Sequence, residues 1–215
     1  MNARSYPFEF TVEASQIPDV TLSVFHTVLF HRTSGKIHFK REGSYSVGTV
    51  GYEDVPCDRL RFTYVRCSCS ALDNDVRRHA DEFADSMKTT TDGKISLQFY
   101  EKKKSHWPFG EASTTWEVWT TRIRVVQPMS DVERERMRDR VERDLADMVA
   151  TVATAVNRVD YVPKVPNEKE LANVFDVHYR EVNPYLHAIS FQLGDEPPHS
   201  GVAGTLRKMI REIAY

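Results

Sequence analysis

Thiol and imidazole groups are the side chains in this sequence whose chemistry comes closest to metal binding. Cys67 and Cys69 stand two residues apart in a segment that alternates like a strand, so both thiols fall on one face of it. A structural zinc site needs a second ligand pair at a similar spacing, and no such pair is found in the sequence. We therefore interpret Cys67 and Cys69 as ordinary buried or half-buried thiols.

The histidines form no recognisable ligand or catalytic cluster. His26 and His31 are five residues apart in a predicted helix and therefore project from different faces. Each is interpreted as a packing or capping residue. The remaining histidines are scattered along the chain, at His38, His79, His106, His178, His187 and His199.

Phosphate chemistry is suggested only by Ser34, Gly35 and Lys36. A phosphate-binding loop also needs an upstream glycine and must open a helix, whereas a strand-like segment follows here. The carboxylates are spread over predicted helices, and no pair stands out as an acid and a base. The sequence therefore predicts a protein that is not an enzyme and that has no metal or cofactor site.

Recognition by aromatic rings is indicated instead at Trp107, Pro108 and Phe109. These residues lie in the loop 105–114, between two segments, 94–101 and 116–126, that alternate like the strands of a long hairpin. Pro108 lacks a backbone donor, so the loop does not continue the strand ladder. Two large rings at a hairpin tip need a partner, either within the chain or on another protein.

The sequence does not decide whether the rings pack within the chain or against another protein. In one interpretation the loop folds back and buries Trp107 and Phe109 over the sheet, as most Trp side chains are highly buried. In the other, the rings protrude as an apolar finger on a solvated neck formed by Lys102–Lys104 and Gly110–Ser113. A protruding finger of this kind is a recognition device, because aromatic residues dominate binding hot spots.

The elements that must position this loop follow from hydrophobic periodicity. Helix spacing, and a capping pair at Ser130 and Glu133, predict one long helix from 131 to 157. In 116–126 the apolar residues fall on one set of alternate positions up to Val118 and on the other set from Trp119 onward, which predicts a β-bulge there. The other predicted elements are helices over 17–30, 70–83, 168–175 and 202–213, a hairpin over 36–47, and strands over 60–65 and 188–193.

Length and composition favour one α+β domain over residues 1–215. The 215 residues, 40% of them hydrophobic, can bury a full core. A net charge of −2 argues against a nucleic-acid partner. We expect a cytoplasmic protein, because the sequence has no apolar signal segment or membrane span and has an odd number of cysteines, Cys57, Cys67 and Cys69.

Several strings of this sequence, taken in order, resemble the autophagy-related protein 101 family, whose members are HORMA-domain components of the autophagy-initiation kinase complex. The resemblance covers nearly the whole chain. In that family the Trp-Pro-Phe tip is called the WF finger, and it matches Trp107, Pro108 and Phe109 residue by residue. The strings are HTVLFHR at 26–32, GSYSVGTVG at 43–51, FTYVR at 62–66, FYEKKKSHWPF at 99–109, WEVWT at 116–120, YVPKVP at 161–166 and PYLHAISFQ at 184–192.

The resemblance implies a HORMA fold, in which helices back a mainly antiparallel central sheet and the C-terminal segment, here 194–215, is mobile. It also implies a non-catalytic adaptor of the Unc-51-like kinase complex at the preautophagosomal structure. Such an adaptor pairs with and stabilises the HORMA domain of autophagy-related protein 13, and its finger recruits later autophagy factors. We expect the helix from Val20 to His31 or the helix from Asp131 to Asn157 to supply part of the partner surface.

A second function stays open beside the adaptor, that of a peripheral membrane binder. Lys102–Lys104 would attract anionic lipid, and Trp107 and Phe109 would insert as an interfacial wedge. A basic face of the predicted C-terminal helix, at Arg207, Lys208 and Arg211, would add to the attraction.

Overall fold

The computed structural model describes residues 3–41, 44–103 and 112–194. The predicted finger residues Trp107, Pro108 and Phe109 lie outside the described residues, and so does the predicted C-terminal segment from residue 195 onward. What the structure describes is therefore the body of the protein and the two strands that lead to and from the finger.

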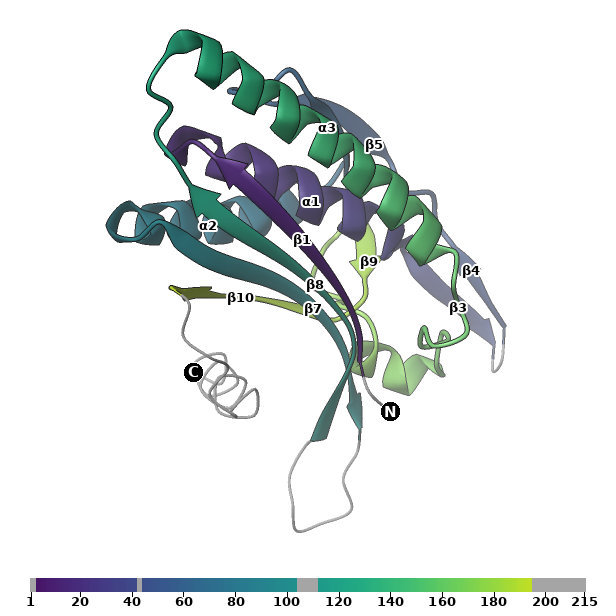
Figure 1. Ribbon diagram of the computed structural model, residues 1–215. Helices are drawn as coiled ribbons and strands as arrows, with labels where there is room; N and C mark the ends of the chain where they lie inside the picture. Colours follow the sequence, from purple (N-terminus) through teal and green to yellow (C-terminus); the bar gives the residue numbers. More distant parts are fainter. Residues whose placement is uncertain (1–2, 42–43, 104–111, 195–215) are drawn as a thin grey trace.

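A four-stranded sheet in the order β1-β8-β7-β10 is the centre of the fold (Figure 1). Its strands are β1 (Arg4–Val12), β8 (Ala112–Val125), β7 (Asp92–Lys103) and β10 (His187–Leu193). The β7–β8 and β7–β10 pairs are antiparallel and only the β1–β8 pair is parallel. The predicted mainly antiparallel central sheet is thus confirmed, although the sequence analysis did not predict β1.

Helices α1 (Ile17–His31) and α2 (Ser70–Ser86) lie against one face of this sheet, and α3 (Asp131–Val156) packs along α1 and β1 (Figure 1). The long helix begins as predicted. The Ser130 hydroxyl accepts from the Glu133 amide at 3.2 Å, while the Glu133 carboxylate accepts from the amide of Met129 at 2.8 Å. Short 3₁₀ turns complete the helical elements, at Ala14–Gln16, Met87–Thr89 and Glu168–Asn173.

In the described residues, three small two-stranded sheets flank the body. They pair β2 (Thr33–Gly35) with β9 (Val182–Pro184), β3 (Ile37–Arg41) with β4 (Ser44–Val47), and β5 (Tyr52–Pro56) with β6 (Thr63–Cys67). The hairpin predicted over 36–47 is confirmed. The strand predicted over 60–65 is wrong at its start, because Leu60 is buried from within the β5–β6 turn and not from a strand.

The main hydrophobic core joins the sheet to helices α1, α2 and α3. Phe25 of α1, Phe83 of α2, and Phe99 and Trp119 of the sheet are among its largest fully buried side chains. Every residue of α1 from Val20 to Leu29 is buried. Of the helix expected to supply a partner surface, only the end at Phe30 and His31 therefore reaches solvent, and the rest is enclosed by the protein's own core.

The cysteines behave as predicted, since Cys57, Cys67 and Cys69 are all free thiols. Cys67 and Cys69 are buried, and Cys57 is half-buried. Burial raises the pKa of Cys57 and of Cys67 to about 11, so both thiols stay protonated and unreactive at neutral pH. None of the helices that the structure describes is long and apolar enough to cross a membrane.

Candidate interaction site at the hairpin stem

The hairpin stem, the outer parts of β7 and β8, leads from the sheet to the predicted finger. We define it as residues 100–103 and 112–115. Their pairing runs from Tyr100 opposite Thr115 to Lys103 opposite Ala112, and it extends beyond the body (Figure 1). Lys102 and Lys103 are exposed on it. The stem therefore brings both ends of the segment with Trp107 and Phe109 to one place outside the core.

A β-bulge separates the stem from the sheet. Phe99 lies opposite Glu117, whereas Tyr100 lies opposite Thr115, so Trp116 is an extra residue on β8. As a result Trp116 and Glu117 are neighbours in sequence and are both buried, with 6% and 0% exposure. The predicted bulge is confirmed, but its predicted place near Val118 and Trp119 is wrong. Glu117, for which the sequence analysis made no prediction, is an inward residue.

Arg32 neutralises the buried carboxylate of Glu117. The arginine directly follows α1, and it donates from Nε to Oε2 at 2.7 Å and from Nη2 to Oε1 at 3.0 Å. Tyr161 completes the group, because its hydroxyl accepts from Arg32 Nη2 and donates to Glu117 Oε1, each at 3.2 Å. We call Arg32, Glu117 and Tyr161 the stem hub. Both carboxylate oxygens are hydrogen-bonded, as a buried charge requires.

The stem hub also holds the ends of two helices. Arg32 Nη1 lies 3.4 Å from the carbonyl oxygen of Val156, the last residue of α3. The Arg32 amide donates to the carbonyls of Val28 and Leu29 in the last turn of α1, at 3.1 and 3.0 Å. One arginine therefore contacts the stem base, α1 and α3.

Aromatic rings enclose the stem hub. Trp116 lies 5.4 Å from Phe99, 5.3 Å from Tyr185 and 6.1 Å from Tyr161, measured between ring centroids. The guanidinium of Arg32 sits 5.7 Å from the Trp116 ring. These rings exclude water from the ion pair and so strengthen its electrostatic attraction.

The protonation states of the stem hub follow from this packing. Burial alone would lower the pKa of Arg32, but its hydrogen bonds and charge attraction to Glu117 outweigh burial and raise the pKa above the ordinary value. Burial and the hydrogen bond with Tyr6 raise the pKa of Tyr161. Arg32 therefore stays a cation and Tyr161 a neutral hydroxyl at neutral pH.

Comparison with known proteins identifies the family. The family model described as autophagy-related protein 101 matches residues 9–169, a range that includes the whole stem hub. The chain is 44% identical to autophagy-related protein 101 of Bos taurus and to that of Homo sapiens. Each match spans 99% of this chain and 98% of the relative. The relative from Arabidopsis thaliana is 24% identical, over 73% of this chain and 78% of its own.

The chain belongs to the autophagy-related protein 101 family. The resemblance found in the sequence is thereby confirmed, and membership gives the protein a role in autophagy. The residues predicted to bind a partner are Trp107, Pro108 and Phe109, which the structure does not describe. The stem leads to them, and the stem hub lies at the base of the stem.

Sequence reasoning missed the functional candidates in the stem hub. Arg32, Glu117 and Tyr161 each stand in a string that carried the family resemblance, HTVLFHR, WEVWT and YVPKVP, but none was assigned a role. One signal was present: a Glu between Trp116 and Val118, beside a change of strand phase. An acid in that position predicts a buried basic partner, but the partner cannot be chosen from sequence.

The exposed side of α3 is a second candidate surface, and its two halves differ. The first half, 131–147, is dense in Arg, Asp and Glu, whereas no charged residue occurs from Met148 to Asn157. The exposed residues of that second half are small or uncharged: Val149, Ala150, Thr151, Ala153, Thr154 and Asn157. A shallow groove of about 400 Å³ lies beside them, where Tyr6 and Arg158 meet Ala150 and Thr154.

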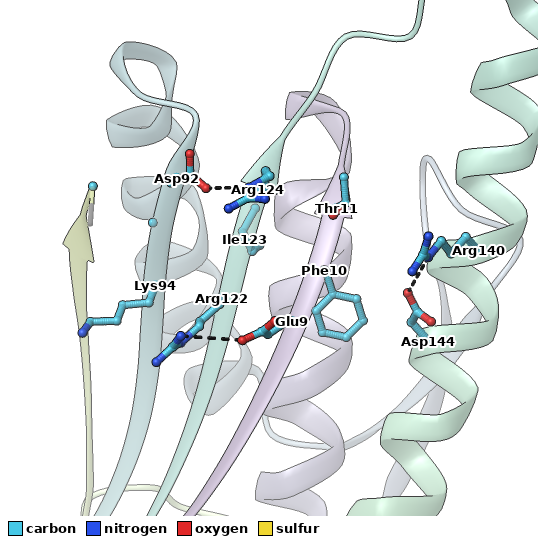
Figure 2. A pocket seen from close by; sticks show the side chains of 12 residues that line it. Glu9, Phe10, Thr11, Asp92, Lys94, Arg122, Ile123, Arg124, Arg140 and Asp144 are labelled. Atoms are coloured by element: carbon cyan, nitrogen blue, oxygen red, sulfur yellow. Dashed lines mark hydrogen bonds and ion pairs between the residues drawn. The ribbon is translucent and has the colours of Figure 1, made fainter. Parts of the chain in front are cut away.

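Other hollows carry mixed charge. A groove of about 460 Å³ beside the stem is lined by Lys102, Lys103 and Lys164 and also by Glu101 and Glu170. At the other end of the sheet, a polar pocket of about 390 Å³ is lined by Lys94 and by three arginines that have carboxylate partners (Figure 2). These ion pairs are Arg124 with Asp92, Arg122 with Glu9, and Arg140 with Asp144.

Metal binding finds no support in the part of the chain that the structure describes. No group of three or more His, Cys, Asp or Glu side chains there is arranged to hold a metal ion. The buried His26 instead lies 3.1 Å from Asp73, between α1 and α2. It is the packing histidine that the sequence predicted.

Proposed function

We propose that this protein is a non-catalytic adaptor with a HORMA fold in the autophagy-initiation kinase complex, which contains the Unc-51-like kinase. It pairs with and stabilises the HORMA domain of autophagy-related protein 13, and it recruits later autophagy factors to the preautophagosomal structure through Trp107, Pro108 and Phe109. Family membership and the sheet backed by three helices support the proposal. The observation that carries the recruiting role is the long hairpin stem, which leaves the body from a buried, ion-paired base.

The double variant Trp107→Ala with Phe109→Ala tests recruitment. In a pull-down of autophagy factors, we expect the variant to lose the proteins that the wild type retains, because aromatic anchors contribute most of the energy of such contacts. Tyr52→Ala is a matched control, since it removes an aromatic ring that is 65% exposed elsewhere on the surface. Equal capture by both variants and the wild type would contradict the proposed finger function.

The partner HORMA domain is assigned to the uncharged half of α3, 148–157. Burial of α1 leaves α3 as the remaining candidate of the two helices, and the small side chains of this half allow another surface to approach closely. A partner that binds only the native state raises the melting temperature as its concentration increases. We expect that rise for the wild type and its loss for Ala150→Arg, while Arg136→Glu, on the charged half, keeps it. An unchanged wild-type melting temperature at saturating partner would argue against pairing.

Peripheral membrane binding is the second candidate function, favoured by the exposed Lys102 and Lys103 on the stem and by Lys164 across the adjoining groove. Glu101 and Glu170 in the same groove oppose it. Sedimentation with anionic vesicles at rising salt decides between the two. A membrane wedge loses its electrostatic attraction as salt rises, whereas an apolar contact with a protein partner persists.

A further inference from the structure

The base of the stem contains a charged pair at a place where apolar side chains would also fill the core. Glu117 is fully buried, and the side chain of Arg32 is 4% exposed. Apolar residues of similar volume would bury the same surface without removing two charges from water, so a buried pair is not the most stabilising choice. What the pair adds is a fixed orientation of Arg32 relative to Glu117, because both of its parallel hydrogen bonds form in only one relative geometry of the two side chains.

That geometry concerns the junction between stem and body. Glu117 is next to the extra residue of the bulge, where β8 changes course toward the finger. Arg32 reaches it from the end of α1, and Tyr161 bridges both from the segment that follows α3. Three separate parts of the chain therefore converge on the turning point of β8.

We propose that Arg32 and Glu117 are positioning residues for the finger: the pair sets the direction in which the stem leaves the sheet and ties that direction to the C-terminal end of α3. The inference rests on the proposed function only in assuming that the loop at the end of the stem binds a partner.

The contact with α3 makes this direction open to regulation. Arg32 donates to both Glu117 and the Val156 carbonyl, so a movement of the end of α3 shifts the hydrogen bonds that hold the stem. A partner bound to the uncharged half of α3 and a ligand bound by the finger then influence each other's affinity. Such coupling is reciprocal by thermodynamic necessity.

The experiment measures the stem direction directly, by electron–electron double resonance between two spin labels. One label is placed on the stem at Ser113→Cys and the other on α3 at Arg136→Cys, both exposed positions. The native Cys57, Cys67 and Cys69 are all free thiols, and Cys57 is only half-buried, so all three are replaced by alanine in every labelled sample, the wild-type reference included.

The apolar pair Arg32→Met with Glu117→Leu is the test variant. We expect it to keep the wild-type melting temperature within a few degrees and to broaden the distance distribution at least twofold. The matched control, Glu9→Leu with Arg122→Met, removes an exposed ion pair that joins β1 to β8 away from the stem, and it should leave the distribution unchanged. If the test variant fails to fold, Arg32→Lys replaces it, since lysine keeps the charge but loses the bidentate geometry.

A distribution as narrow as that of the wild type would overturn the inference, because strand packing would then direct the stem alone. Addition of the HORMA domain of autophagy-related protein 13 gives a second readout, a shift of the wild-type distribution that is absent in the apolar variant. Broadening supports the positioning role whether or not the finger variants lose recruitment. Failure of this inference and failure of the proposed function are therefore distinguishable.

Discussion

Two arginines of this protein bind carboxylates in opposite surroundings. Arg32 is buried and pairs with one acid, Glu117, through two hydrogen bonds. Arg61, in the turn between β5 and β6, is 59% exposed and lies within 3.3 Å of three acids of α3, Glu135, Asp139 and Glu142. Arg61 therefore has more carboxylate partners than Arg32.

The comparison teaches that burial, and not the number of partners, decides what an ion pair does. Around Arg61, water screens each attraction and the side chains lose entropy when they are held in place. Around Arg32, the low dielectric strengthens the attraction but makes an unpaired charge very costly. The buried pair therefore specifies one geometry at the stem base, whereas the exposed network adds little to the attachment of the turn to α3.

The largest effect is expected for Glu117→Gln, which keeps the shape of the side chain and leaves the buried Arg32 without its counter-charge. Breaking a buried pair in this way costs about 3–5 kcal/mol of unfolding free energy. Chemical denaturation measures it, with Arg61→Gln as the control. A loss below about 1 kcal/mol would show that the pair is not sealed from solvent and would remove the contrast between the two arginines.

A smaller effect is expected for Tyr161→Phe. The change removes a hydroxyl that bridges Arg32 and Glu117 but keeps the ring beside Trp116. Loss of one such bridge costs on the order of 1–2 kcal/mol. In the Glu117→Gln background the same change should cost less, because the bridge has already lost its charged acceptor. Equal costs in both backgrounds would mean that Tyr161 is not part of the stem hub.

The pH dependence of stability sharpens the comparison at a third site, where buried His26 and Asp73 meet the partly exposed Arg66 and Arg77. Burial lowers the pKa of His26, although Asp73 opposes this, and the hydrogen bonds of His26, Arg66 and Arg77 lower the pKa of Asp73 in spite of its burial. The unfolded chain therefore binds more protons than the folded one as pH falls below about 6.5, and again below about 4. Stability should decrease with acidity in both windows.

His26→Gln isolates the share of His26 in the first window. The variant should lose that share, while His31 and His187, whose pKa values burial also lowers, keep theirs. The decrease that begins near pH 4 should remain when stability is followed by denaturant titration at a series of pH values. An identical profile for the variant and the wild type would show that His26 has the same proton affinity in both states.

The smallest effect is expected for Arg61→Gln at neutral pH. Its carboxylate partners stay hydrated when the arginine is lost, so the melting temperature should change by no more than the error of the measurement. A large decrease would show that the turn between β5 and β6 depends on this network for its attachment to α3.

Sequence reasoning recovered the parts of this fold that depend on local signals. Helix α3 was predicted because its cap at Ser130 and its apolar spacing lie within one segment. Strand β1 was missed although Tyr6, Phe8, Phe10 and Val12 alternate along it, and its parallel partner β8 lies more than a hundred positions away in the sequence. Nothing near Arg4–Val12 specifies that partner.

The stem also shows that local sequence signals do not fix long-range pairing. Alternation predicted both strands and even a bulge, but the phase of the bulge depends on the register between β7 and β8. A shift of the bulge by two residues exchanges the environment of Glu117, from solvent to core. Its partner Arg32 is 85 residues away in sequence, so the stem hub could be recognised only once the chain was folded.

The melting temperature of the Trp107→Ala, Phe109→Ala double variant tests the central claim most directly, because it separates a finger that only recognises from a loop that stabilises. Our account, in which the stem hub holds the base and the tip binds a partner, predicts a melting temperature close to that of the wild type. A loop folded back over the sheet would instead lose two large core side chains, at about 3–5 kcal/mol each. A fall in melting temperature of that size would contradict the account.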